Sequence, residues 1–125
     1  MDQFKGCILV VEDDDLLRDV VVQTLEEEDY CILSAKDGAE AINMLQLVRY
    51  CVILLDFNLP GIGASGVVDW MRETGSRVPV VLMTGDAHAQ EIAVQLGVAG
   101  CLEKPFGLDQ LLSMVAHCEK QYHPV

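Results

Sequence analysis

Side chains that could do chemistry together follow four of the five short apolar runs of this sequence. They are the acidic residues Glu12, Asp13, Asp14 and Asp15 after the first run, Asp56 after the third, Thr84 after the fourth and Lys104 after the fifth. Carboxylates that are brought together repel one another unless a cation offsets their charge. Mg²⁺ suits such a site, because it binds carboxylate and carbonyl oxygens together with a phosphate oxygen. The set therefore predicts a magnesium site that serves phosphoryl chemistry.

Each member of the set has a predicted role. Asp56 is the predicted nucleophile, because a carboxylate can attack a phosphoryl donor and form an acyl phosphate. The predicted ligands of Mg²⁺ are Asp13, Asp56 and the main-chain carbonyl of Asn58. Glu12 is expected mainly to interact with these ligands and less to bind the ion directly. Lys104 and the hydroxyl of Thr84 would each contact one phosphoryl oxygen.

The elements that must position these residues are indicated by alternating apolar patterns. Residues 7–11, 30–34, 51–55, 80–83 and 100–102 form short apolar runs that predict buried strands. The segments after each run carry apolar residues at helical spacing, for example Leu16, Val20 and Leu25. Strictly alternating strands and helices predict a doubly wound five-stranded parallel sheet with helices on both faces, an α/β fold. In such a sheet all strands end at one edge, which would gather the four polar segments.

Helix boundaries are predicted from residues that satisfy free backbone groups. Asp14 or Asp15, Asp37 and Asp86 can accept hydrogen bonds from N-terminal amides, and Gly97 can end the fourth helix. Gly66 is predicted to open the third helix after a long loop.

Composition favours one globular domain, spanning residues 1–125. The chain is 51% hydrophobic and 22% charged, with a formal net charge of −12 that disfavours direct binding to nucleic acid or to anionic membranes. No apolar run reaches the roughly 18 residues of a membrane span, and residues 1–5 lack a signal-peptide pattern, so we expect a cytoplasmic protein. The five cysteines show no CxxC spacing and are expected to be reduced, buried thiols.

Four ordered motifs resemble those of response-regulator receiver domains over essentially the whole chain. They are ILVVEDD at 8–14, LLDFNLPG at 54–61, VVLMTG at 80–85 and LEKPF at 102–106. Singly these motifs are weak, but their order and spacing together are highly specific.

The resemblance implies a flavodoxin-like (βα)5 fold with strand order 2-1-3-4-5. It also implies Mg²⁺-dependent phosphorylation of Asp56 by a histidine kinase or a phosphotransfer protein, phosphoryl contacts from Thr84 and Lys104, and a cis peptide bond before Pro105. Such a protein is not an enzyme beyond its own phosphorylation and slow dephosphorylation. Its phosphorylation would switch binding to a downstream protein partner in a two-component system.

The chain departs from the receiver pattern at Cys101. Receivers usually carry Phe or Tyr three residues before the lysine, and a cysteine cannot supply that aromatic volume. We therefore expect a weaker or different conformational response to phosphorylation. Asn58 and Asp86, each two residues after a site residue, occupy positions that tune the access of water to the acyl phosphate in similar receivers.

Several alternatives stay open at this stage. A Mg²⁺-dependent phosphohydrolase usually has a second aspartate at the position of Asn58, and a flavodoxin-like electron carrier needs a hydroxyl-rich phosphate cradle after its first strand. A receiver-like interaction module without phosphorylation is kept open by Cys101. The chain could act alone, as a phosphorelay intermediate, or as the receiver part of a larger regulator or hybrid kinase.

Overall fold

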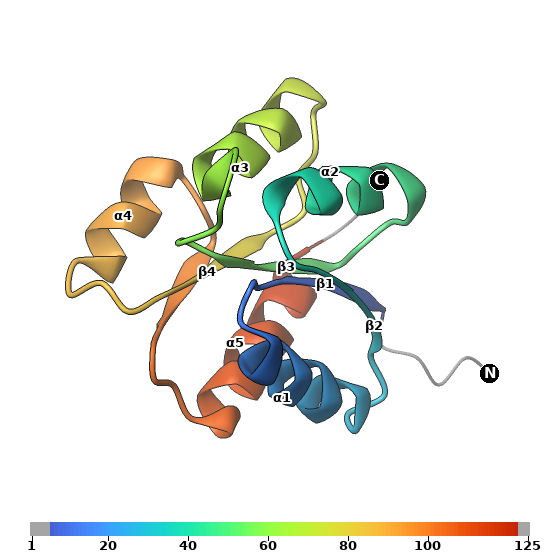
Figure 1. Cartoon of the computed structure of the whole chain (residues 1–125). Coiled ribbons are helices and arrows are strands. Elements are labelled where there is room, and N and C mark those ends of the chain that lie inside the picture. The colour runs from blue at the N-terminus through green and yellow to red at the C-terminus, as the bar shows by residue number, and fades with distance from the viewer. Residues whose placement is uncertain (1–5, 123–125) are drawn as a thin grey trace.

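A single parallel sheet organises the part of the chain that the computed structural model describes, residues 6–122 (Figure 1). Residues 1–5 and 123–125, which the single-domain prediction includes, lie outside this range. Within it, strands and helices alternate as β1 (Cys7–Val11), α1 (Asp15–Glu26), β2 (Cys31–Ala35), α2 (Gly38–Leu47), β3 (Val52–Asp56), α3 (Gly63–Glu73), β4 (Val80–Thr84), α4 (Ala89–Leu96), β5 (Gly100–Glu103) and α5 (Leu108–Gln121). The strand order is β2-β1-β3-β4-β5, which confirms the predicted fold class and order.

Both faces of the sheet are covered by helices, with α2, α3 and α4 on one face and α1 and α5 on the other (Figure 1). Successive residues of a strand point to opposite faces, so Leu9 and Ile53 enter the core under α2 to α4, whereas Ile8 and Val52 enter the core over α1 and α5. This double coverage explains why the central strands β1, β3 and β4 are almost completely buried. No helix within residues 6–122 has the length and apolar character that a bilayer crossing requires.

Three of the predicted helix boundaries are confirmed. The Asp14 side chain accepts a hydrogen bond from the backbone N–H of Leu17 (3.1 Å) and caps α1. Asp37 caps α2 in the same way, through a 2.8 Å bond from Glu40 N–H. Gly97 ends α4 in the left-handed conformation, with φ of 69°.

Two boundary predictions were wrong. Gly66 does not open the third helix but lies inside α3, because α3 already begins at Gly63 and the Ile62 side chain packs against Gly66. A Cβ atom at position 66 would lie 3.1 Å from Ile62 Cβ, so the small residue serves close packing. Asp86 does not cap α4, since His88 holds the N-cap position; Asp86 instead accepts a 2.7 Å bond from His88 N–H in the turn before the helix.

Candidate functional site

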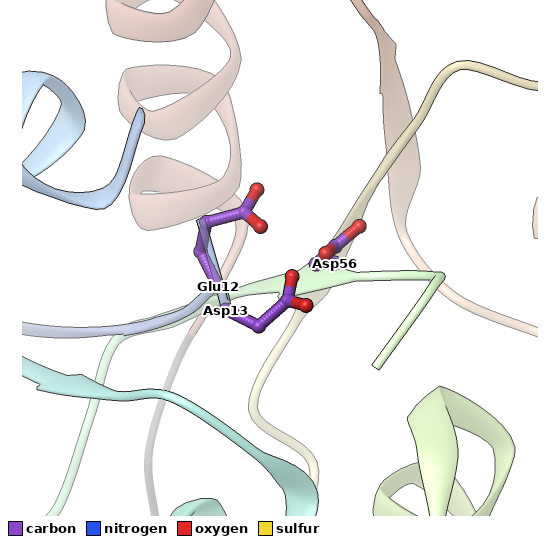
Figure 2. Close-up of side chains that lie close together, drawn as sticks. All are labelled: Glu12, Asp13 and Asp56. Atoms are coloured by element: carbon purple, nitrogen blue, oxygen red, sulfur yellow. The ribbon is translucent and has the colours of Figure 1, made fainter. Parts of the chain in front are cut away.

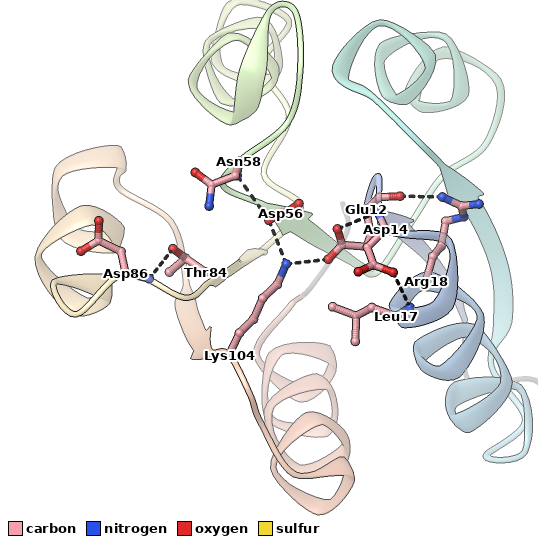
Figure 3. Close-up of polar contacts among 9 residues, drawn as sticks. All are labelled: Glu12, Asp14, Leu17, Arg18, Asp56, Asn58, Thr84, Asp86 and Lys104. Atoms are coloured by element: carbon pink, nitrogen blue, oxygen red, sulfur yellow. Dashed lines mark hydrogen bonds and ion pairs between the residues drawn. The ribbon is translucent and has the colours of Figure 1, made fainter.

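The predicted site residues do meet at the carboxyl edge of the sheet. Asp56 and Thr84 are the last residues of β3 and β4, Glu12 and Asp13 follow β1, and Lys104 follows β5. Because β3 lies between β1 and β4, the acidic pair and Asp56 come from neighbouring strands. Lys104 starts from the edge strand β5 and extends past the ends of β4 and β3 toward Glu12 (Figure 3).

Three carboxylates form the centre of the site. Oxygen atoms of Glu12, Asp13 and Asp56 all lie within 4.8 Å of one another (Figure 2). Among residues 6–122, this is the one group of at least three histidine, cysteine or acidic side chains close enough to share a metal ion. Glu12 and Asp56 are buried, while Asp13 is exposed to solvent. An all-oxygen, multiply negative, partly solvated donor set fits Mg²⁺, which prefers oxygen ligands and keeps several waters.

Lys104 supplies a positive charge to the site. Its Nζ atom lies 2.8 Å from Glu12 Oε1 and 3.2 Å from Asp56 Oδ1 (Figure 3). Burial acts to lower the pKa of Lys104, but hydrogen bonds and charge interactions with the two carboxylates outweigh it and raise the pKa. The ammonium group is therefore charged at neutral pH.

The two buried carboxylates respond to this arrangement in opposite directions. Burial and the neighbouring Asp56 raise the pKa of Glu12 to about 7, although Lys104 and the Asp14 N–H act against the shift. For Asp56, burial acts to raise the pKa, but hydrogen bonding with Glu12 and the charge of Lys104 prevail and lower it. Glu12 is thus the carboxyl group that takes up a proton first, and Asp56 stays ionised and able to act as a nucleophile.

Backbone amides and one arginine hold the acidic groups in place. The N–H of Asp14 donates to Glu12 Oε2 (3.2 Å), and the N–H of Asn58 donates to Asp56 Oδ1 (3.3 Å). Arg18 donates to the main-chain oxygen of Glu12 (2.8 Å) and pairs with Asp15 (2.6 Å). Sequence reasoning missed Arg18; its position three residues after Asp15 on a helix predicts the ion pair but not the bond to Glu12.

Thr84 lies at the site without a hydrogen bond to Asp56. Its hydroxyl oxygen accepts a hydrogen bond from the N–H of Asp86 (3.1 Å), and no hydrogen bond joins it to Asp56 among the described residues (Figure 3). The backbone oxygen of Thr84 accepts a 2.7 Å bond from Lys104 N–H, which connects the ends of β4 and β5. The Lys104–Pro105 peptide bond is cis, as the resemblance implied.

Cys101 is buried in β5, in register with Leu82 of β4, and belongs to the core under α2 to α4. It also lines a cavity of about 680 Å³ between β5 and α5, whose wall includes Lys104, Met114 and His117. This cavity lies on the α5 side of β5, whereas the Cys101 side chain packs in the core on the opposite face. The altered response that we expect from Cys101 stays a prediction.

Comparison with known proteins agrees with this geometry. Residues 8–116 match the family model of the response regulator receiver domain. The receiver domain of HemR from Leptospira biflexa has a similar structure, with a TM-score of 0.85, 28% sequence identity, and coverage of 95% of this chain and 98% of that chain. The chain therefore belongs to the receiver domain family of two-component response regulators, which disfavours the phosphohydrolase and electron-carrier alternatives.

Curated relatives resemble this chain over only part of their own length. The uncharacterized transcriptional regulatory protein YkoG of Bacillus subtilis is 31% identical over 119 residues, which cover 94% of this chain and 52% of YkoG. The hybrid signal transduction protein dokA of Dictyostelium discoideum is 32% identical over 87% of this chain and 7% of dokA. The chain spans about half the length of the first curated relatives that it matches.

Proposed function

We propose that this receiver domain accepts a phosphoryl group on Asp56 from a histidine kinase or a phosphotransfer protein and thereby switches its binding to a downstream protein. The observation that supports this most strongly is the buried, ionised Asp56 at the end of β3, within 4.8 Å of two further carboxylates and 3.2 Å from Lys104 Nζ. The family to which the chain belongs agrees with this role.

Each residue of the site has a part in the proposed transfer. An oxygen of Asp56 attacks the phosphorus atom of a phosphohistidine, the P–N bond breaks, and the released imidazole takes a proton. Glu12, Asp13, Asp56 and the carbonyl of Asn58 would hold Mg²⁺, which when bound offsets the negative charge on the phosphoryl oxygens.

Lys104 and Thr84 would bind the phosphoryl oxygens whose charge Mg²⁺ does not offset. Lys104 now shares its ammonium group between Glu12 and Asp56, so it can turn toward a phosphoryl oxygen bound at Asp56. The Thr84 oxygen already accepts the Asp86 N–H, which leaves its hydroxyl hydrogen for another phosphoryl oxygen. The domain acts on no separate substrate in this proposal, and its only reactions are its own phosphorylation and slow dephosphorylation.

The proposal extends to partners and location. With 20 acidic against 8 basic residues, the chain favours cationic protein surfaces over nucleic acid or anionic membranes. We place its activity in the cytoplasm, as one receiver domain that works alone, in a phosphorelay, or as part of a longer regulator or hybrid kinase.

Intact mass spectrometry tests the proposal. The protein is incubated with acetyl phosphate or phosphoramidate, with Mg²⁺ or with excess EDTA, in wild-type, Asp56→Asn and Asp69→Asn forms. We expect one phosphoryl adduct on wild type and on Asp69→Asn, whose side chain lies exposed on α3, and only with Mg²⁺. Equal phosphorylation of Asp56→Asn would refute the assigned acceptor, and phosphorylation that is indifferent to EDTA would refute the metal requirement.

Cys101 favours one second candidate, a receiver-like interaction module that takes no phosphate. The buried cysteine lacks the ring that receivers usually place there, and so the phosphoryl group would have no aromatic switch to move. Absence of any adduct on correctly folded wild-type protein with Mg²⁺ would support this candidate over the first.

A further inference from the structure

Two cysteines lie together at the edge of the sheet opposite to Asp56. Cys7 is the first residue of β1 and Cys31 is the first residue of β2, and Figure 1 shows these two strands side by side. Both thiols are free and half-buried. The proposed phosphoryl chemistry at the carboxyl edge uses neither of them.

The pairing of β1 with β2 places these two cysteines directly opposite each other. Cys7 and Cys31 are Cα partners in the parallel ladder, followed on the same face by the pair Leu9 and Leu33. Neighbouring strands lie roughly 4.8 Å apart. A disulfide needs Cα atoms about 4.4–6.8 Å apart, and the strand spacing meets this requirement for the Cα atoms.

The thiols also interact with each other. Burial, and next hydrogen bonding with Cys31, raise the pKa of Cys7 to about 11. The buried Tyr50 belongs to the core against which Cys7 packs, and burial raises the pKa of Tyr50 to about 12. Cys31 lies on the edge strand β2, which has no further strand beside it among residues 6–122. Its side chain is only half-buried, so small reagents can reach the thiol.

Cys51 is the nearest competitor as a partner for Cys7, and packing argues against it. Its N–H donates to the carbonyl of Cys7 (2.8 Å), but its side chain packs against the core over α1 and α5. Cys7 packs against the opposite core, under α2 to α4. The three thiols also form no common metal-binding group, since the only such group within residues 6–122 is acidic, so two-sulfur chemistry fits this place better than a metal ion.

We propose that Cys7 and Cys31 are a redox modification site, which a low-molecular-weight disulfide such as oxidised glutathione converts into an intramolecular disulfide. The Cys31 thiolate attacks one sulfur of glutathione disulfide, forms a mixed disulfide and releases one glutathione thiolate. The Cys7 sulfur, once it has lost its proton to solvent, then attacks the Cys31 sulfur and releases the second glutathione. The two cysteines lose two electrons and two protons, and glutathione disulfide is reduced to two thiols.

The bridge would join the edge strand β2 covalently to β1 and enclose the segment that contains α1. Because a disulfide reduces the freedom of the unfolded chain, we expect oxidation to raise Tm by roughly 5–10 °C. The effect should reverse with dithiothreitol.

The experiment treats the folded protein with glutathione disulfide, without denaturant, and maps the products by intact mass and by peptide analysis under non-reducing conditions. We expect the intact mass to fall by two hydrogen atoms and a peptide pair that links Cys7 to Cys31. Cys101→Ser and Cys118→Ser serve as matched controls, because these cysteines lie apart from the pair on β5 and α5, and both variants should still form the link.

Three outcomes would overturn the proposal. These are a folded wild-type protein that gains no intramolecular link, a link from Cys7 to Cys51 in place of Cys31, and an oxidised protein whose Tm does not rise. Cys7→Ser is the negative control and should form no link. If Cys7→Ser folds poorly, Cys31→Ser on the edge strand replaces it and must retain stable glutathione adducts or free thiols without the link. Loss of phosphorylation at Asp56 has no bearing on these readouts, so the two proposals fail independently.

Discussion

The buried carboxyl group of Glu12 should make the stability of the metal-free protein depend on pH. Its pKa is raised from the usual 4.5 to about 7, with burial and Asp56 as the main causes. In the unfolded chain Glu12 ionises with its usual pKa. In the folded protein, burial and the charge of Asp56 make the ionised form less favourable. A carboxyl group with a raised folded pKa contributes stability that is fully present below pH 4.5 and lost as the pH rises through 7.

The expected loss follows from the two pKa values. They differ by about 2.5, and a difference of one pKa unit corresponds to about 1.4 kcal/mol, so the whole contribution is about 3 kcal/mol, of which about 2.5 kcal/mol of unfolding free energy should disappear between pH 5 and pH 8. Asp56 acts in another window, because its pKa is lowered and its contribution is lost only as the pH falls through the acidic range. The interval from pH 5 to pH 8 therefore isolates Glu12 from Asp56.

The perturbation is Glu12→Gln, which keeps the shape of the protonated side chain and cannot ionise. Urea unfolding in EDTA-containing buffers at pH 5, 6, 7 and 8 measures the effect. We expect the variant to be more stable than wild type by less than about 1 kcal/mol at pH 5 and by about 3 kcal/mol at pH 8. Glu91→Gln, an exposed glutamate on α4, is the matched control and should follow wild type.

Two results would refute this reasoning. Wild-type protein that is as stable at pH 8 as at pH 5 would show that Glu12 is not held in a raised-pKa environment. An equal decline in wild type and Glu12→Gln would assign the pH dependence to another group. Saturating Mg²⁺ at pH 8 should restore stability to wild type, because a ligand that binds only the folded state stabilises it.

Three further variants test the remaining parts of the site. Lys104→Ala leaves two buried carboxylates without their ammonium, so we expect a loss of about 3 kcal/mol in metal-free protein at pH 8 by urea unfolding; it should still accept a phosphoryl group, but partner affinity should no longer shift on phosphorylation. Asp13→Asn removes one carboxylate and should weaken Mg²⁺ binding about tenfold or more in calorimetric titration, and unchanged affinity would remove Asp13 from the ligand set. Asp14→Ala should cost about 1 kcal/mol by loss of the α1 cap, with Asp14→Ser restoring most of it and phosphorylation unaffected in both.

The layout of the fold was accessible from local patterns. Short apolar runs that alternate with helical spacing can be satisfied by a parallel sheet with helices on both faces, since each strand then buries all its residues. The same layout predicts that residues after β1, β3, β4 and β5 meet at one edge of the sheet. The sequence alone therefore predicted that Asp13, Asp56, Thr84 and Lys104 lie close together. The strand order itself came from the family resemblance, because apolar patterns alone do not distinguish the neighbours of a strand.

Contacts inside the site needed the tertiary structure. Lys104 was expected to contact a phosphoryl oxygen, and the structure adds that its ammonium group pairs with Glu12 and Asp56, whose negative charges attract it. Arg18 was not expected at the site, and only the direction in which α1 leaves β1 brings it to the main-chain oxygen of Glu12. Gly66 was assigned as the glycine that opens the third helix in the receiver pattern, whereas in the structure it lies inside α3 and packs against Ile62.

By itself, the sequence determined which residue types stand at the ends of the strands, and hence that oxygen ligands, a nucleophile and a cation are available at one edge. Only the tertiary structure decided how these groups share charge, so that the pKa of Glu12 is raised to about 7 while that of Asp56 is lowered. It also decided that Cys7 and Cys31 face each other, since the register of β1 against β2 depends on both strands at once. Composition and spacing are local properties of the sequence and predict local structure. Burial, strand register and charge balance depend on residues that are far apart in sequence.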